Sequence, residues 1–100
     1  MILPVTFSST AVAEIKKILA VKGIDNHQLG LRVAIKGAGC SGTSFILGFD
    51  SKTENDVEFL MDEFKIFIEK KHFLYLVGME IDFIDDNYTR GFTFNSKNNI

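Results

Sequence analysis

The sequence predicts an α+β fold that is mainly β, with short and mostly antiparallel strands, one longer helix near the N-terminus and one short helix further on. Two observations predict it. Apolar residues alternate with polar ones in several short runs, which is typical of strands, and the spacing typical of a helix occurs in only two places. We expect the strands to fold into a sandwich or a pseudo-barrel. A chain of 100 residues with 46% hydrophobic content can bury a core, so we expect a single domain over residues 1–100.

The first two elements are a strand and a helix. Residues 2–7 alternate weakly and predict a short strand, in which Pro4 is tolerated only at an edge or at the strand start. Apolar residues then recur at helical spacing and predict a helix over residues 10–22. Ser9 or Thr10 is available to cap the first turn of this helix.

Glycines are expected to end both helices. Gly23 ends the first one, and Ile24 is placed to contact Leu19 in a Schellman-type cap. Residues 70–77 suit a short helix that ends at Gly78. The element order is therefore strand, helix, four strands, helix and two strands.

The remaining strands follow from period-two alternation between polar turns. The first of them is expected to bury one face, and it forms a hairpin with the next around a glycine-rich turn. A tight turn at Asp62-Glu63 joins the following pair, and a turn at Asp86-Asn87 joins the last pair. The strands are predicted over residues 29–36, 44–50, 57–61, 64–68, 81–85 and 92–94.

Charge and composition argue against several classes of partner. The net charge is −2 and the basic residues are scattered, so the sequence lacks the clustered Lys and Arg that nucleic-acid binding needs. No apolar run approaches the length of a membrane span, and the N-terminus has no basic n-region of a signal peptide. One cysteine cannot form an intramolecular disulfide. We therefore expect a cytoplasmic protein that binds neither nucleic acid nor membrane.

Cys40, the single cysteine, is the best indicator of function. It lies in Gly37-Ala38-Gly39-Cys40-Ser41-Gly42, where backbone N–H groups can stabilise a thiolate. Spacing alone leaves a ligand or reactive thiol as plausible as a structural role. The same residues match the dinucleotide pattern G-x-G-x-x-G, but a strand follows them instead of the required helix, so we reject that interpretation.

Other polar residues favour structural interpretations. His27 is expected in a solvated loop and His72 on a helix surface, and neither placement implies contact with the cysteine. Asp82, Asp85 and Asp86 lack the spacing of a calcium loop and are expected at a solvated strand end. The alternating phenylalanines are expected in the core, because no basic residues interleave with them as in a base-stacking surface.

Several segments together form a recognisable pattern that covers nearly the whole chain. The most specific one is Leu-Arg, six further residues and then Gly-Cys-Ser-Gly. The segments are Gly30-Leu31-Arg32-Val33, Lys36 to Gly42, Phe49-Asp50, Phe64 to Glu69, Leu74 to Gly78, Ile81-Asp82-Phe83 and Gly91 to Asn95. This pattern resembles the A-type iron-sulfur carriers, the HesB/IscA-like family, and the element order predicted above agrees with it.

The resemblance implies a HesB-like domain that is not an enzyme, is commonly dimeric, and binds iron or an iron-sulfur cluster for transfer to apo-proteins. Cys40 corresponds to the first of the family's three cysteine ligands. Gly37, Gly39 and Gly42 would let the turn close around the metal centre and open again. The other two cysteines, a C-terminal Cys-Gly-Cys motif, have no counterpart here. The implied partners are iron-sulfur assembly proteins or apo-protein acceptors.

Three hypotheses follow for this incomplete ligand set. In the first, two copies bring together two Cys40 thiolates, and small thiols or a partner protein complete the cluster's ligands, normally thiolates. In the second, the domain keeps the fold as a degenerate binding or regulatory module without cluster chemistry. In the third, which is the most distant, Cys40 is a redox or transferase thiol.

Overall fold

A computed structural model describes residues 2–23, 28–36, 44–61 and 63–96. The chain divides into two compact units, one made of Met1–Lys22 with Leu76–Ile100 and the other of Gly23–Tyr75. The prediction of a single domain over residues 1–100 stays a prediction.

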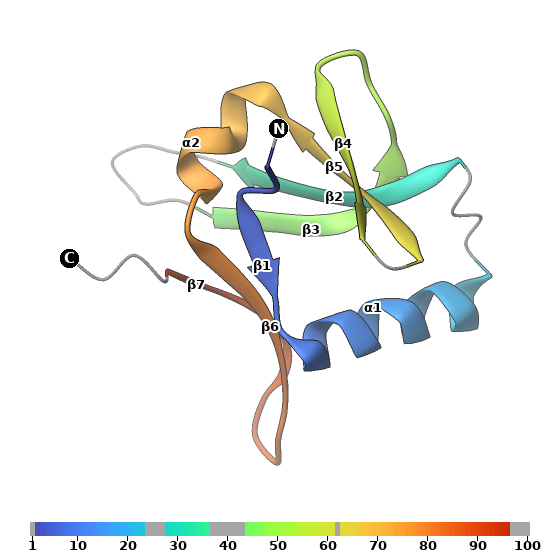
Figure 1. Cartoon of the computed structure of the whole chain (residues 1–100). Helices are drawn as coiled ribbons and strands as arrows, with labels where there is room; N and C mark the ends of the chain where they lie inside the picture. Colours follow the sequence, from blue (N-terminus) through green and yellow to red (C-terminus); the bar gives the residue numbers. More distant parts are fainter. Residues whose placement is uncertain (1, 24–27, 37–43, 62, 97–100) are drawn as a thin grey trace. The chain divides into compact units, whose positions relative to one another are not determined.

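The elements confirm the predicted mainly β fold with one longer N-terminal helix and one short helix (Figure 1). Three strand pairings are antiparallel and two are parallel, so both sheets are mixed. The elements are β1 (Val5–Phe7), α1 (Ser9–Lys22), β2 (Leu29–Lys36), β3 (Ser44–Ser51), β4 (Asp56–Met61), β5 (Phe64–Glu69), a 3₁₀ turn (Lys70–His72), α2 (Phe73–Leu76), β6 (Met79–Asp85) and β7 (Arg90–Ser96).

The unit that contains both chain ends has a three-stranded sheet in the order β1-β6-β7. β1 pairs with β6 in parallel, and β6 pairs with β7 in an antiparallel hairpin. Burial of apolar side chains from the sheet and from α1 stabilises this unit. Its fully buried residues are Val5, Ala11, Ile15, Leu76 and Ile81.

The helix α1 begins one residue earlier than predicted. Ser8, not Ser9 or Thr10, is the capping residue, because its Oγ accepts a hydrogen bond from the Ala11 backbone N–H at 3.1 Å. Gly23 adopts a φ of 61°, which confirms its predicted role in ending the helix. The predicted contact of Ile24 lies outside the described residues.

The first strand is shorter than the predicted residues 2–7. It covers only Val5–Phe7, because Pro4 has no N–H for the ladder and precedes the strand. The Pro4 carbonyl instead accepts a hydrogen bond from the Gly78 N–H at 3.1 Å. The predicted edge position is confirmed, since β1 has one neighbour in its sheet.

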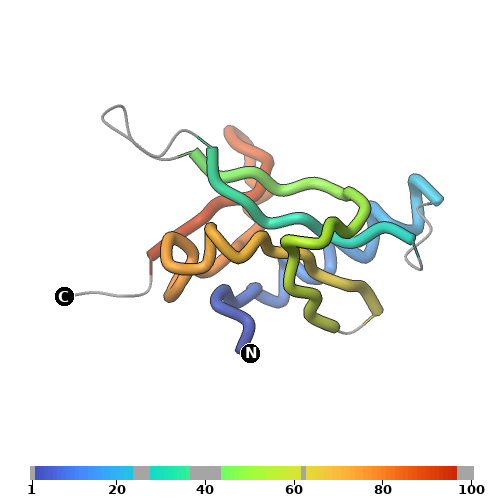
Figure 2. The backbone as a smooth tube through the Cα atoms, turned by 90° about the horizontal axis from the view of Figure 1, so that it is seen from above, coloured from blue at the N-terminus to red at the C-terminus, as the bar shows by residue number. Residues whose placement is uncertain are grey.

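The second unit contains a four-stranded sheet in the order β3-β2-β5-β4. β2 and β3 form an antiparallel hairpin of eight residue pairs and run side by side in both views (Figure 2). β4 and β5 form the second hairpin, joined by residues 62 and 63 as predicted. β2 and β5 pair in parallel and connect the two hairpins. The sheet buries Leu31, Val33, Ala34, Phe64, Ile66, Phe67 and Ile68.

β2 buries both faces, which corrects the prediction of one buried face. Ala34 on the second face is only 6% exposed. The same face carries Gly30, where a Cβ atom would lie 2.6 Å from the Phe67 ring. A small residue is needed at position 30 because the ring of Phe67, from the neighbouring strand β5, covers it.

The predicted short helix is present, as the 3₁₀ turn followed by α2. Gly78 ends this segment with a φ of 80°, as predicted. The Phe73 ring packs on Phe59 of β4 with a centroid distance of 5.9 Å. This contact connects the beginning of α2 to the edge of the four-stranded sheet.

Candidate functional site

The β2–β3 hairpin places the ends of the segment that contains Cys40. Lys36 and Ser44, the last and first residues of the two strands, are paired with one another. The segment of residues 37–43 therefore joins adjacent strand ends. Cys40 and the three glycines Gly37, Gly39 and Gly42 themselves lie outside the described residues, so their roles stay predictions.

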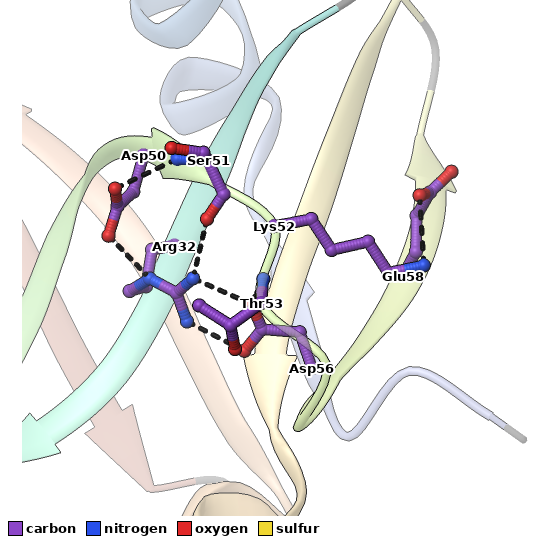
Figure 3. A network of polar contacts seen from close by, with 7 residues as sticks. All are labelled: Arg32, Asp50, Ser51, Lys52, Thr53, Asp56 and Glu58. Atoms are coloured by element: carbon purple, nitrogen blue, oxygen red, sulfur yellow. Dashed lines mark hydrogen bonds and ion pairs between the residues drawn. The ribbon is translucent and has the colours of Figure 1, made fainter.

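A dense polar cluster lies at the other end of the same hairpin (Figure 3). Arg32 of β2 donates hydrogen bonds to both carboxylate oxygens of Asp56, at 2.7 and 2.6 Å. It also donates to the Asp50 carboxylate at 3.0 Å and to the Ser51 carbonyl at 2.9 Å. The Thr53 backbone N–H donates to Asp56 at 2.8 Å. We call these five residues the Arg32 cluster.

The Arg32 cluster is largely removed from water. The Asp56 side chain is 0% exposed and that of Arg32 is 15% exposed. The hydrogen bonds from Arg32 hold the pKa of Asp56 well below its usual range, at about 2, against the opposing effect of burial. The same contact with Asp56 raises the pKa of Arg32, which stays charged at any physiological pH.

The Arg32 cluster has a structural role and is not a reactive site. Arg32 lies on β2, Asp50 and Ser51 end β3, and Asp56 begins β4. A bidentate guanidinium–carboxylate pair in a poorly hydrated site has both strength and a fixed geometry. The cluster therefore fastens β2, β3 and β4 to one another, three strands that are consecutive in the sequence although β5 separates β2 from β4 in the sheet.

A second polar cluster lies at the start of α1 and corrects one prediction. Asp82 accepts hydrogen bonds from the Ser8 hydroxyl at 2.5 Å, the Thr10 hydroxyl at 2.9 Å and the Phe83 N–H at 2.8 Å. These bonds, the one from Ser8 first, lower the pKa of Asp82. Asp82 is therefore a partner of the helix N-terminus, where a negative charge is favourable, and not merely part of a solvated strand end.

The other two residues of that acidic set organise the β6–β7 hairpin. Asp86 accepts hydrogen bonds from the backbone N–H groups of Tyr88 and Thr89, at 2.8 and 2.7 Å, and these bonds lower the pKa of Asp86. Asp85 forms an ion pair with Arg90 at 3.5 Å. They stabilise the predicted turn, so a calcium loop remains rejected.

The two histidines supply no metal site in the described residues. His27 lies outside them. His72 lies on the 3₁₀ turn and is half-buried, so the expected helix-surface position holds only in part. Its Nδ1 is buried and has no hydrogen-bond partner among the described residues. No group of three or more His, Cys, Asp or Glu side chains that could hold a metal ion occurs in residues 2–23, 28–36, 44–61 and 63–96.

Sequence reasoning missed the Arg32 cluster. The signal was present, because a charged residue in the middle of an apolar strand is buried only when it is paired. Asp50, at the end of the next strand, was one visible partner. The main partner, Asp56, is 24 residues from Arg32 in the sequence, and no local pattern indicates that contact.

Comparison with known proteins shows what kind of domain this is. A model of the family described as iron-sulphur cluster biosynthesis matches residues 3–99. The chain belongs to this iron-sulphur cluster biosynthesis family. The match confirms the predicted HesB/IscA-like resemblance over nearly the whole chain, and the prediction that the protein is not an enzyme, because the family consists of A-type iron-sulfur carriers.

Curated relatives agree with the family match. The chain is 36% identical over 94 residues to "Iron-sulfur cluster assembly 1 homolog, mitochondrial" of Columba livia, covering 93% of this chain and 69% of the relative. The protein of the same name from Gallus gallus is 37% identical over 94 residues, with 93% and 70% covered. Both relatives are mitochondrial by name.

Solved structures share the fold. SufA of Escherichia coli, involved in biosynthesis of iron-sulfur clusters, superposes with a TM-score of 0.75 at 24% identity, covering 96% of this chain and 82% of SufA. A solution structure of a protein from Aquifex aeolicus gives 0.70 at 33% identity, covering 94% and 92%. A crystal structure of IscA with the 2Fe-2S cluster gives 0.75 at 19% identity, covering 94% and 86%. The family fold is thus confirmed.

Proposed function

We propose that this protein is a carrier or assembly factor that binds iron or an iron-sulfur cluster through the Cys40 thiolate. The family match over residues 3–99 carries the proposal. Cys40 supports it further, since it lies in the segment between the paired ends of β2 and β3. By its resemblance to this family, Cys40 corresponds to the first of the family's three cysteine ligands.

The ligand count requires help from outside one chain. A two-iron cluster needs four ligands, normally thiolates, and these 100 residues contain one cysteine. The described residues offer no cluster of carboxylates and histidines that could replace the missing thiolates. We therefore propose that a homodimer brings two Cys40 thiolates together, and that small thiols or a partner protein complete the set.

Such a centre would exchange its cargo readily. In a cluster held by two protein thiolates, the other two ligand positions are filled by exchangeable ligands. An incoming thiolate can replace these, so an acceptor protein with more cysteines competes well for the cluster. Gly37, Gly39 and Gly42 would give the turn the freedom to close around the cluster and to open during exchange. The expected partners are iron-sulfur assembly proteins and apo-protein acceptors, not nucleic acid or membrane.

The location stays a prediction. In the part of the chain that the structure describes, no helix is long and apolar enough to cross a membrane. We propose the cytoplasm, where a free thiol stays reduced. Fractionation of cells that express the tagged protein would test this, and recovery in mitochondria, as the names of the relatives indicate, would contradict it.

Anaerobic reconstitution tests the function. The protein is incubated with ferrous iron, sulfide and a small thiol, desalted, and its visible spectrum is compared with that of Cys40→Ser. We expect charge-transfer absorption in the wild type and its loss in the variant, because thiolate-to-iron charge transfer requires the ligand. A colourless wild type would favour the alternative, a degenerate binding or regulatory module, and colour in Cys40→Ser would exclude Cys40 as the ligand.

A further inference from the structure

An open hollow lies where β4 begins and β5 ends. Its volume is about 370 Å³, and it is lined by Asn55, Glu69, Lys70 and Lys71, all in the unit of Gly23–Tyr75. The volume falls within the range of roughly 300–1,000 Å³ that is typical of small-molecule sites. None of the four side chains belongs to the Arg32 cluster. We call it the Lys70 hollow, and its lining indicates what kind of ligand it fits.

Backbone hydrogen bonds hold the two sides of the Lys70 hollow in place. The Lys70 N–H donates to the Asn55 carbonyl at 3.0 Å. Asp56, the residue after Asn55, is paired with Glu69 in the antiparallel β4–β5 ladder, and its N–H donates to the Thr53 carbonyl at 3.1 Å. The lining side chains therefore extend from fixed backbone positions, which lowers the entropy cost of binding a ligand.

The charges in the Lys70 hollow are mixed. The Lys71 ammonium pairs with the Glu69 carboxylate at 3.2 Å, and the two side chains are 72% and 29% exposed. An ion pair this open to water contributes little to stability, so each group can exchange its partner for a ligand at low cost. Lys70 is exposed and makes no ion pair in the part of the chain that the structure describes. The hollow thus offers two cations, one anion and the Asn55 amide.

A ligand with charges of both signs fits this set best. We infer that the Lys70 hollow binds a small peptide that carries two carboxylates and one amino group. The carboxylates pair with Lys70 and Lys71, and the amino group pairs with Glu69. A simple anion such as phosphate pairs with the lysines as well, but the Glu69 carboxylate repels it. The Asn55 amide both donates and accepts hydrogen bonds, so it matches a peptide group of the ligand.

The ligand can be narrowed to a peptide thiol, and this narrowing rests on the proposed function. β2 and β5 run parallel, so Lys36 and Glu69 end their strands at the same end of the sheet (Figure 1). Glutathione has two carboxylates, one amino group and a thiol, and it is the small thiol of reducing compartments. Bound in the Lys70 hollow, it would supply a thiol at the end of the sheet where residues 37–43 follow β2. The match of charges does not depend on the thiol.

The test uses the full chain without iron and S-methylglutathione, which keeps all three charges of glutathione but has a blocked sulfur. Backbone amide shifts of the isotope-labelled protein are followed by NMR during the titration, and inorganic phosphate at matched ionic strength is the second probe. The variants are Lys70→Gln and Glu69→Gln. Lys22→Gln is the matched control, because Lys22 is an exposed lysine at the end of α1 in the other unit.

We expect S-methylglutathione to shift the amides of the four lining residues and to bind more tightly than phosphate. Lys70→Gln should raise the Kd of both probes about threefold, since it removes one exposed ion pair from each complex. Glu69→Gln should lower the preference for S-methylglutathione over phosphate about threefold, because the amino group loses its partner while phosphate loses a repulsion. Lys22→Gln should match the wild type with both probes.

Any of four results would overturn the inference: no shifts at the lining residues, equal affinity for phosphate, wild-type affinities in Lys70→Gln, or an unchanged preference in Glu69→Gln. The outcome is separable from that of the proposed function, because iron and a free ligand thiol are both absent from the titration. Selective binding together with a colourless reconstitution would support the hollow and remove the proposed function. Colour on reconstitution without selective binding would do the reverse.

Discussion

The two units of this protein each contain an arginine cluster, and the two clusters differ in their physics. Arg32 is 15% exposed, and its hydrogen bonds to Asp56 and Asp50 are 2.6–3.0 Å long. Arg90 is 55% exposed, and its ion pairs with Glu14 and Asp85 are 3.3 and 3.5 Å long. Both arginines contact two carboxylates, so the number of ion pairs does not distinguish them.

The Arg32 and Arg90 clusters differ in how far they are removed from water and in the geometry of their ion pairs. Arg32 faces a carboxylate with no exposed surface and binds both its oxygens, so neither partner can be removed without leaving a buried charge. Arg90 also packs over the Phe83 ring, 5.1 Å from the centroid, but water can replace each of its carboxylate partners. The first cluster should control the stability of its unit, and the second should contribute little.

The largest effect should come from Asp56→Ala. This change leaves the Arg32 guanidinium mostly buried without its main partner, which should lower the free energy of unfolding by about 3–5 kcal/mol. Urea denaturation followed by circular dichroism measures it. A loss below about 1 kcal/mol, the range of a surface pair, would show that the Arg32 cluster is no different from that of Arg90.

Acid should weaken the Arg32 cluster through Asp56. Because its pKa falls from 3.8 to about 2 on folding, its stabilising effect is complete above the pKa of the unfolded chain and is lost as the pH drops from about 5 towards 2. The shift corresponds to about 2 kcal/mol. Unfolding of the wild type and Asp56→Asn should be compared at pH 7, 5 and 3, chosen to span this window.

Between pH 7 and pH 3, Asp56→Asn should lose less of its free energy of unfolding than the wild type. The lowered pKa values of Asp50, Asp82 and Asp86 act in the same direction in both proteins and leave a shared acid sensitivity. Equal pH dependence in the two proteins would contradict the assignment to Asp56.

One glycine in each unit allows the packing of the two units to be compared. Gly30→Ala places a Cβ atom 2.6 Å from the ring of Phe67, which is 2% exposed and has little room to move, so we expect a loss of about 1–3 kcal/mol. Gly91→Ala in the other unit meets nothing within 4 Å and is the control. Thermal unfolding compares the two, and equal melting temperatures would contradict tight packing around β2.

The smallest effect should come from Glu14→Gln. Although the Glu14 side chain is 13% exposed, its partner Arg90 is open to solvent, so the pair should contribute less than about 1 kcal/mol and less still at high salt. Urea denaturation at low and high salt measures this. A salt-independent loss comparable to that of Asp56→Ala would remove the distinction between the two clusters.

Local signals predicted the elements well. Gly23 and Gly78 end the two helical segments with positive φ angles, and the alternating runs gave the strands within a few residues. These features depend on neighbouring residues alone. The cap of α1 was misplaced by one residue, because Ser8, Ser9 and Thr10 are all good caps and the choice depends on the contact of Ser8 with Asp82.

Long-range pairing was beyond local signals. The division into two mixed sheets rests on the parallel pairs β1–β6 and β2–β5, which no turn specifies. The contact of Arg32 with Asp56 likewise depends on how β4 returns beside β5. Cys40 was identified from the sequence alone, because it lies outside the described residues.

The mass and iron content of the reconstituted protein test whether two Cys40 thiolates hold one cluster. Because each chain supplies one thiolate, we predict that native mass spectrometry finds a dimer with one two-iron cluster, about one iron per chain, and that Cys40→Ser abolishes this species. A wild-type monomer that carries a cluster, or a dimer that binds equal iron with and without Cys40, would contradict the proposal that two Cys40 thiolates hold the cluster.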